Sequence, residues 1–263
     1  MKKYLLSLLA VAALVFTACN KDPQPNKPDK PDTPDDPEPE VPEYVQPITI
    51  DGDFADWAKL DASKVAVAKC ASDTKDGYDA VKEIRVYADE LYVFFYLEYN
   101  NDKIADILAG TTNPADPEHN ELPIRLNLNT DGEFTSGYTS YSLDGYDFIV
   151  EGAVATDGAW SSFDGTLHQR IDGGWTELLA GGSGMCSGAG SGNKYEICLI
   201  REVFNAAAGS STVPMPMGDE FQAGVRFYTA PWGELCNMPN SPVSDDNANG
   251  YGHLLNITTD SAE

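Results

Sequence analysis

The sequence predicts an all-β fold: a two-sheet antiparallel β-sandwich, jelly-roll-like, with one or two short helices. From residue 48 onward, short apolar stretches are separated by Gly, Asn and Asp, which end strands and form turns. Within the clearest stretches, apolar side chains recur at every second residue, the period of a strand with one buried face. Only two short segments have a helical period, so the strand–helix alternation of an α/β protein is absent from the pattern.

The first 18 residues have the features of an export signal. Lys2 and Lys3 precede an apolar run, residues 4–16, that is too short for an ordinary membrane span. The run ends in L-V-F-T-A-C, which resembles the bacterial lipobox, in which cleavage leaves Cys19 as a lipidated N-terminus. A plain secretory signal cut near Ala18 is the alternative. We expect the lipoprotein, because the cysteine stands where the apolar run ends.

Residues 19–47 are predicted to form the lipidated cysteine and a linker. Nine of the seventeen prolines lie between residues 21 and 47, interleaved with Asp, Glu and Lys. Such a composition buries too little apolar surface to offset the entropy of ordering, so we expect an extended, solvated segment. Asn20-Lys21-Asp22 resembles the charged signal that sends some Gram-negative lipoproteins to the outer face of the cell. We therefore expect an outer-membrane protein that faces the exterior and touches the membrane only through its lipid.

The net charge of −25 makes nucleic acid and anionic membrane surfaces unsuitable partners, because like charges repel. The same charge is compatible with a calcium site, with neutral glycans, or with solubility alone. It excludes two classes of partner without naming the one that binds.

The predicted domain, residues 48–263, opens with I-T-I-D-G-D-F-A-D-W-A-K-L. Ile48 and Ile50 alternate with polar neighbours, which predicts a half-buried strand. The D-G-D that follows is a turn sequence, and Asp56 is expected to cap a short helical turn. Trp57 is expected to fold back onto the core.

Residues 81–88 and 91–99 are the clearest strands, and Asp89 and Glu90 between them predict a tight hairpin. The second strand is apolar on one face and mainly aromatic on the other, and we expect a helix at residues 101–109 to cover the aromatic face. Further strands are expected at residues 122–128, 145–151, 194–199, 221–228 and 254–258, with a second short helix at 201–207.

Three segments of the domain carry a further signal. They are the opening I-D-G with D-W after it, the run L-N-L-N-T-D-G-E-F-T-S-G-Y with G-Y-D-F-I-V-E-G after it, and Y-E-I-C-L-I-R-E-V-F. Together they resemble the family 9 carbohydrate-binding modules and the related DOMON-like β-sandwich domains. The chain departs from the family pattern at Asn129, where an acidic residue is usual, and near Arg201, where a proline is usual. The resemblance implies a sandwich that binds a glycan.

Family 9 modules hold their sugar between tryptophans, so the resemblance implies that loop tryptophans bind the ligand here. Trp160, Trp175 and Trp232 lie in Gly- or Pro-flanked segments and are the candidates, because the C–H faces of sugars lie on exposed rings. The alternative for each is that it plugs an end of the sandwich. The polar candidates, which would bond to sugar hydroxyls, are Glu234 and Asn237 after Trp232, and Arg170 and Asp172 before Trp175.

No sequence motif of a catalytic site is present. The chain has no G-x-S-x-G, H-E-x-x-H, Walker or dinucleotide-binding sequence, and its three histidines are far apart. Acidic residues are so abundant that chance pairs are certain, so their number does not predict a glycosidase. We expect non-catalytic binding of an oligo- or polysaccharide at the cell surface. The main alternative is a structural or adhesion module that binds a cell-surface protein, and a glycoside hydrolase is the third hypothesis.

No cofactor is expected to be required, and a structural calcium ion is the one that the sequence suggests. Asn129 and Asp131 lie in N-L-N-T-D-G, which has the alternation and the glycine of a calcium loop but lacks the distal acid. Asp51, Asp53 and Asp56 form a second candidate cluster. Turn and capping roles explain both clusters without a metal, and we prefer that interpretation.

Four cysteines remain besides Cys19, and their spacing fits no zinc site: Cys70, Cys186, Cys198 and Cys236. An exported protein permits up to two disulfides among them. Cys186 and Cys198 bracket a Gly/Ser-rich turn, and a hairpin there would bring them close together. Free buried thiols are also compatible with the sequence, so the pairing stays open.

Overall fold

The computed structural model describes residues 44–112, 120–133, 135, 137–230 and 232–260. Its contacts divide the chain into Met1–Tyr44 and Val45–Glu263, and every described strand and helix belongs to the second unit. The predicted signal, Cys19 and most of the linker lie outside the described residues. Within the described part, none of the helices has the length and apolar composition needed to cross a bilayer.

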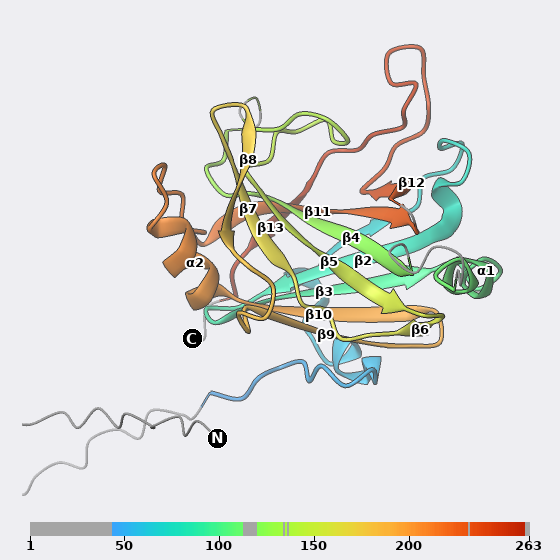
Figure 1. The fold of residues 1–263 in the computed structure, drawn as a ribbon, viewed down its shortest axis with the longest axis horizontal. Helices are drawn as coiled ribbons and strands as arrows, with labels where there is room; N and C mark the ends of the chain where they lie inside the picture. The colour runs from blue at the N-terminus through green and yellow to red at the C-terminus, as the bar shows by residue number, and fades with distance from the viewer. Residues whose placement is uncertain (1–43, 113–119, 134, 136, 231, 261–263) are drawn as a thin grey trace, which may run out of the picture. The chain divides into compact units, whose positions relative to one another are not determined.

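The protein is a two-sheet antiparallel β-sandwich, as the sequence predicts (Figure 1). The five-stranded sheet has the order β1 (Ala66–Lys69), β2 (Val81–Ala88), β3 (Tyr92–Tyr99), β10 (Lys194–Ile200) and β9 (Cys186–Ser191). The eight-stranded sheet has the order β12 (Gly233–Met238), β11 (Glu220–Thr229), β4 (Glu121–Asn129), β5 (Phe148–Thr156), β7 (Thr166–Ile171) and β8 (Gly174–Leu179). Two short strands complete it, β13 (Leu255–Thr258) beside β11 and β6 (Ala159–Trp160) beside β5.

The main core lies between the two sheets and follows the period-two pattern of the strands. On β4, Leu122, Ile124, Leu126 and Leu128 are buried in this core, while the residues between them face the other side of the sheet. The same alternation holds on β11 and on β3. Because successive side chains of a strand point to opposite faces, each sheet also presents an outer face, and the two outer faces differ in chemistry.

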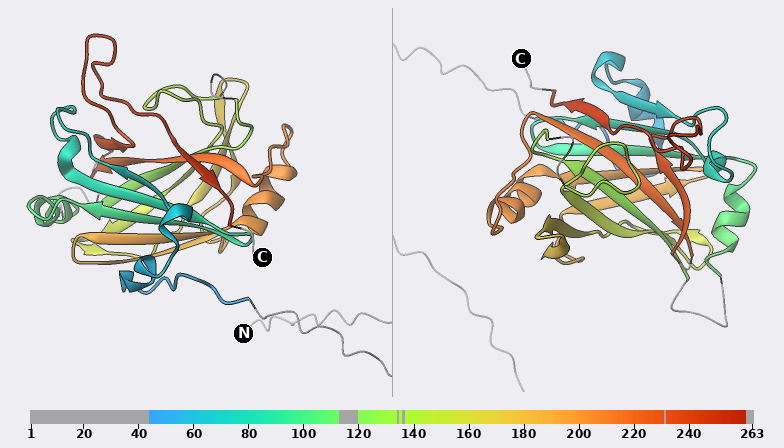
Figure 2. Two further views of the ribbon diagram at one scale, coloured as in Figure 1. Left: turned by 180° about the vertical axis from the view of Figure 1, so that it is seen from behind. Right: turned by 90° about the horizontal axis from the view of Figure 1, so that it is seen from above.

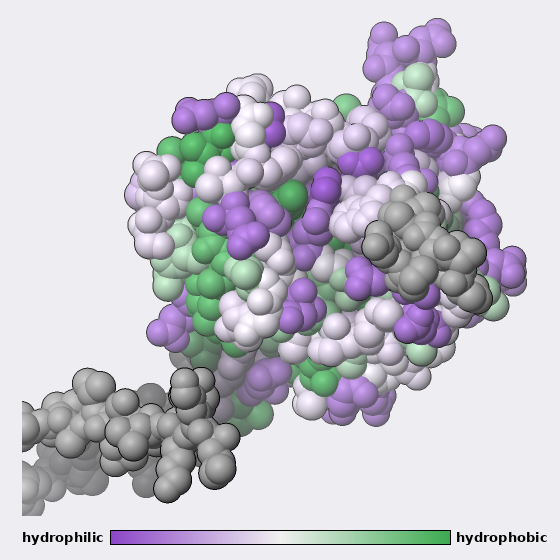
Figure 3. All heavy atoms as spheres, in the orientation of Figure 1, coloured by the Kyte–Doolittle hydropathy of each residue, from purple (hydrophilic) through white to green (hydrophobic). Residues whose placement is uncertain are grey.

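Two α-helices lie at opposite ends of the sandwich (Figure 2). They are α1 (Ile104–Ala109) and α2 (Arg201–Gly209), and three short 3₁₀ helices accompany them, η1 (Phe54–Ala58), η2 (Ala62–Lys64) and η3 (Tyr78–Ala80). Figure 3 shows apolar residues gathered on the side of α2, whereas the loop that projects between β12 and β13 is mainly hydrophilic. The helix α1 packs against the main core through Ile104 and does not cover the aromatic face of β3, so that expectation was wrong.

The aromatic outer face of the five-stranded sheet is covered by the opening segment of the domain. Ile48 and Trp57 are buried there against Phe94, Tyr96 and Cys198, and Figure 1 shows this segment in blue outside β9 and β10. Trp57 is therefore a core residue, as predicted. The expected strand at Ile48 and Ile50 does not form.

Two aspartates of the opening stretch, Asp53 and Asp56, shape the cover. Asp53 caps η1 by accepting the N–H of Ala55, so it takes the role expected of Asp56. Asp56 instead accepts the N–H of Thr49 and pairs with Lys59.

Glu196 on β10 fixes this cover to the sheet. Its side chain is fully buried, and one carboxylate oxygen accepts the backbone N–H groups of Asp51 at 3.1 Å and Gly52 at 2.9 Å. The other oxygen accepts the indole N–H of Trp57 at 3.2 Å. Burial raises the pKa of Glu196 above its usual range, although these three donors favour the ionised form. One carboxylate thus satisfies three N–H groups of the cover, and that of Trp57 is buried.

All four cysteines of the described residues are free. Cys186 and Cys198 do lie on one hairpin, but Cys186 is opposite Leu199 and Cys198 is opposite Ser187. Their side chains therefore point to opposite faces of the sheet, where they join different apolar clusters.

The Glu196 contact predicts an energetic coupling with Trp57. In Glu196→Gln, the amide keeps one acceptor oxygen, but its NH₂ group faces an N–H donor. We expect the free energy of unfolding to fall by about 1–3 kcal/mol, the cost of an unsatisfied buried donor. In a Trp57→Phe background, the same change should cost less by about 1 kcal/mol, because no indole N–H is left to oppose the amide. Urea unfolding of the four proteins measures this coupling, and equal costs in both backgrounds would contradict it.

Candidate functional site

The outer face of the eight-stranded sheet collects most of the arginines of a strongly acidic chain. Arg125 on β4, Arg170 on β7 and Arg226 on β11 lie on it, three of the five arginines in the sequence. The strand register places Arg226 directly opposite Arg125, and Arg125 directly opposite Glu151 of β5, with which it forms an ion pair. The net charge of the chain is −25, so this concentration of cations is a local feature.

Aromatic rings connect these arginines across the sheet. The guanidinium carbon of Arg125 lies 5.7 Å from the ring of Trp232 and 5.2 Å from the ring of Tyr228. The guanidinium carbon of Arg226 lies 4.7 Å from Tyr228 and 3.0 Å from Tyr141. Such cation–π contacts hold both groups in place.

The same pattern continues toward the far edge of the sheet. The ring of Tyr141 lies 6.3 Å from that of Tyr138, and Tyr138 lies 5.5 Å from Trp175 of β8. Arg170 stacks over both Tyr138 and Trp175. We call this set the aromatic–arginine array: Trp232, Tyr228, Arg125, Arg226, Tyr141, Tyr138, Arg170 and Trp175.

Two aromatic residues of the array have strained backbones. Trp232 has a φ of 65° and Tyr141 a φ of 75°, in the left-handed region that bulky residues avoid. They are the only aromatic residues among the five described non-glycine residues with positive φ. Both rings lie over arginines of the same face. Strain of this kind gathers at functional sites, because the surrounding structure must enforce it.

Trp232 also forms part of a groove of about 390 Å³. The indole is 43% exposed, the largest exposure of any tryptophan here, and it lies in the hairpin between β11 and β12. The groove runs over the outer face of β4, β5 and β7 and carries both carboxylates and hydroxyls. Its lining includes Glu121, Pro123, Glu151, Ser161, Asp164 and Thr166.

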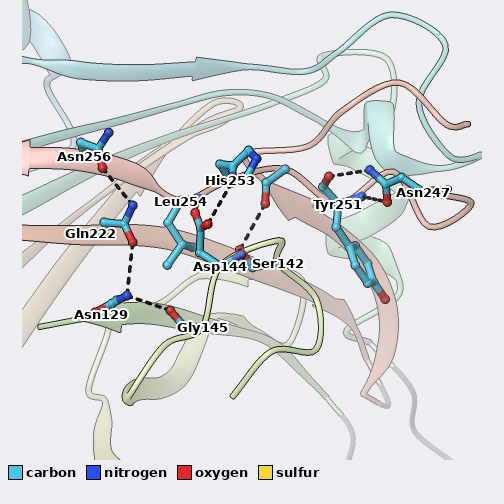
Figure 4. A network of polar contacts seen from close by, with 11 residues as sticks. Asn129, Ser142, Asp144, Gly145, Gln222, Asn247, Tyr251, His253, Leu254 and Asn256 are labelled. Carbon is cyan, nitrogen blue, oxygen red and sulfur yellow. Dashed lines mark hydrogen bonds and ion pairs between the residues drawn. The ribbon is translucent and has the colours of Figure 1, made fainter. Parts of the chain in front are cut away.

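Two long loops lie over the other end of this face and are bonded to each other, through the described residues 137–147 of one and 239–254 of the other (Figure 4). The buried Asp144 accepts the N–H of Leu254 at 2.8 Å and contacts the Nδ1 atom of His253 at 2.8 Å. Ser142 donates to the carbonyl of Gly252 at 3.1 Å. These contacts hold the loop that carries Tyr138 and Tyr141 in place above the sheet.

The tryptophans named from the sequence fall into different environments. Trp232 stands exposed in the hairpin between β11 and β12, and its role in binding stays a prediction. Trp175 lies in β8 and not in a loop, half-buried against Tyr146, with Arg170 directly opposite on β7. Trp160 lies in β6, packs on Tyr99 and Tyr195, and donates its indole N–H to the carbonyl of Gly192 at 3.1 Å, so it closes an end of the sandwich.

The polar residues named from the sequence are only partly near the array. Glu234 contacts the hydroxyl of Tyr78 and the ammonium group of Lys75, and Asn237 donates to the same hydroxyl at 2.9 Å. Neither lines the groove beside Trp232. Asp172 is exposed in the turn between β7 and β8.

The residues of the suggested calcium loop have turn roles in the structure. Asn129 is buried, donates to the carbonyl of Gly145 and to Gln222, and accepts the N–H of Gly132. Asp131 accepts the N–H of Glu133 at 2.7 Å. Within the described ranges, no three His, Cys, Asp or Glu side chains come together in a way that could hold a metal ion. Calcium binding stays a prediction.

The sequence analysis missed several members of the site, among them Arg125, Arg226, Tyr141 and Glu151. A signal for the arginines was present, because each stands at an outward position of a predicted strand whose inward positions are apolar. What the sequence could not supply is the register that places Arg226 opposite Arg125. No protein-family model matches the sequence, and no curated protein matches it either.

Asp147, just before β5, gives the covering loops a dependence on pH. It is buried and accepts the N–H of Thr130 at 3.2 Å. Burial, with the charge of Asp131 as a second cause, raises the pKa of Asp147 to about 6. The folded protein therefore binds a proton here that the unfolded chain has lost between pH 4 and pH 6, so this group destabilises the fold as the pH rises through that window.

Asp147→Asn should remove this dependence, because the amide does not ionise. We compare the free energy of unfolding of the variant with that of the native protein at each pH. The difference, variant minus native, should be larger at pH 7 than at pH 4 by about 1–3 kcal/mol. Urea unfolding at both pH values measures the gain. Asp172→Asn, at an exposed acid, is the control that should leave the pH dependence unchanged. Parallel pH profiles for Asp147→Asn and the native protein would show that the buried carboxyl does not titrate in this range.

Proposed function

We propose that the protein binds a carbohydrate chain without cleaving it, and that the groove beside Trp232 is the binding site. The observation that carries the proposal is the exposed indole of Trp232, held over Arg125 at one wall of the groove. A sugar ring presents a C–H face that packs on such an indole, and its hydroxyls need polar partners at the edge. Glu151, Asp164 and Thr166 line the groove and supply acceptors and a hydroxyl.

The conformation of Trp232 adds support. A tryptophan at a φ of 65° costs about 1–2 kcal/mol relative to glycine, and glycine is the residue that such a hairpin position favours. The indole contributes little to the main core, because it is exposed and Tyr228 is the one ring of the described residues on which it packs. A strained and exposed aromatic residue is better explained by ligand binding than by folding.

The cellular setting of this activity is also part of the proposal. The lipobox-like sequence ending in Cys19 and the proline-rich linker support a domain tethered to the outer membrane and standing away from it. The resemblance to family 9 modules supports the same class of ligand. A protein-binding module is the alternative, and the glycan test below separates the two.

Trp232 provides the test. The chain from residue 20 to 263, without its signal and lipidated cysteine, should bind a subset of glycans on an array. Trp232→Gly should lose that binding by at least about fivefold, since a stacked ring contributes about 1–3 kcal/mol. The same variant should keep its stability to within about 1 kcal/mol, because glycine relieves the backbone strain.

Leu91→Ala is the matched control, because Leu91 is 42% exposed in the turn between β2 and β3 and lies away from the groove. It should bind as the native protein does. A folded native protein that binds no glycan would contradict the proposal and favour the protein-binding alternative. Release of shorter sugars during incubation would instead indicate a glycosidase.

A further inference from the structure

Buried polar atoms without a partner gather on the outer face of the eight-stranded sheet. Eight such side-chain atoms occur among the described residues, and five of them lie here: Asn127 Oδ1, His168 Nδ1, Arg226 Nε, Tyr228 OH and Asn237 Oδ1. Folded proteins satisfy the great majority of their buried polar groups, with water or ligand where the protein supplies no partner. Because five of the eight lie on one face, we infer that this face is a binding site for a ligand with polar groups.

Four of these atoms belong to one patch. Asn237 is directly opposite Arg226, and Tyr228 follows Arg226 two residues later on the same face of β11. Asn127 is on the neighbouring strand, two residues from the position opposite Arg226. Arg226, Tyr228, Asn127 and Asn237 are each more than nine-tenths buried. We call these four residues the orphan patch.

The charge of Arg226 is the strongest feature of the orphan patch. The residue is 6% exposed, and no carboxylate among the described residues pairs with it, whereas Arg125 beside it pairs with Glu151. Burying a cation without a counter-charge is unfavourable, and stacking on tyrosines offsets only part of the cost. Arg226 is therefore a buried cation for which the described residues supply no counter-charge.

The hydrogen-bond donors and acceptors of the orphan patch indicate which kind of anion could bind there. Arg226 Nε and the Tyr228 hydroxyl are donors, and burial raises the pKa of Tyr228 to about 12, so its proton is retained. The two Asn Oδ1 atoms are acceptors and need donors. A carboxylate satisfies the first pair and sugar hydroxyls satisfy the second. A simple inorganic anion without hydrogen-bond donors would leave both amide oxygens unsatisfied.

We propose that the glycan is acidic, a chain that contains uronic acid, and that its carboxylate binds Arg226 while the chain packs on Trp232. This inference rests on the proposed function and adds the class of sugar. Tyr228 joins the two parts, because its ring contacts both Trp232 and Arg226. Glu121 and Asp164 also line the groove, and Asp164 already accepts the backbone N–H of Gly182, so we assign these two carboxylates to sugar hydroxyls and not to the sugar carboxylate. The half-buried ring of Tyr141 lies over Arg226, so this binding mode requires that ring to move aside while the hydrogen bonds of Ser142 and Asp144 keep the rest of the loop in place.

Titration calorimetry with matched sugars tests the inference on the chain from residue 20 to 263. The probes are hexasaccharides of galacturonic, glucuronic and mannuronic acid, each beside its carboxyl-reduced neutral counterpart. At least one acidic hexasaccharide should bind ten times more tightly than its neutral counterpart. Arg226→Gln should abolish that preference. Arg85→Gln should keep it, because Arg85 also stacks on a tyrosine, Tyr96, but on the five-stranded sheet.

The outcomes separate the inference from the proposed function. Equal binding of acidic and neutral sugars, still lost in Trp232→Gly, would overturn the acidic class and leave glycan binding standing. Binding to none of these sugars and to no glycan on the array would overturn both. The comparison of acidic and neutral sugars uses the native protein, so it decides the question even where Arg226→Gln fails to fold.

Discussion

The two sheets of the sandwich have different outer faces, one covered and one with a groove, and this difference depends on the buried carboxylate of Glu196. It accepts three N–H groups from the opening segment and so fixes that segment over the aromatic outer face of the five-stranded sheet. A sandwich has two outer faces, and this contact makes one of them part of the folded interior. The other outer face, that of the eight-stranded sheet, carries the polar side chains and the groove beside Trp232.

The outer face of the eight-stranded sheet is polar, whereas that of the five-stranded sheet is aromatic. Its covering loops are held by hydrogen bonds, with Asp144 between them, and the layer beneath consists of arginines, tyrosines and amides in place of aliphatic side chains. Such a layer is a poor core, because guanidinium and amide groups remain unsatisfied in it. The same property supports the proposal that this face binds a ligand. The strained backbones of Trp232 and Tyr141 agree with this contrast, since neither conformation is needed for the main core.

Much of the fold could be predicted from the sequence, because period-two alternation is a local property. The strands that became β2, β3, β4 and β11 were predicted closely, and Trp57 was correctly expected in the core. The errors concern contacts between distant segments. The cover of the aromatic face comes from residues 48–60 and not from α1, and this depends on Glu196, far away in the sequence. The alternation of apolar residues within one segment does not predict which other segment packs on it.

The same limit applies to the candidate site. Trp232 could be singled out, because an aromatic residue beside glycine in a predicted turn is a local signal. Glu234 and Asn237 were expected to join it only because they are near in sequence, yet both bond to Tyr78. Arg125 and Glu151, which do stand beside Trp232, are brought there by strand pairing. Cross-strand register, which a single sequence does not reveal, decides the composition of the groove.

The four indole N–H groups offer the most direct test of the central claim, that the Trp232 groove binds carbohydrate. Each gives its own NMR signal in ¹⁵N-labelled protein, and the indole N–H groups of Trp57 and Trp160 are bonded to Glu196 and to the carbonyl of Gly192. On titration with the acidic and neutral hexasaccharides, the signal of Trp232 should move while those of Trp57 and Trp160 stay in place. Movement of Trp57 or Trp160 with Trp232 unchanged, or no movement of any indole, would contradict the account.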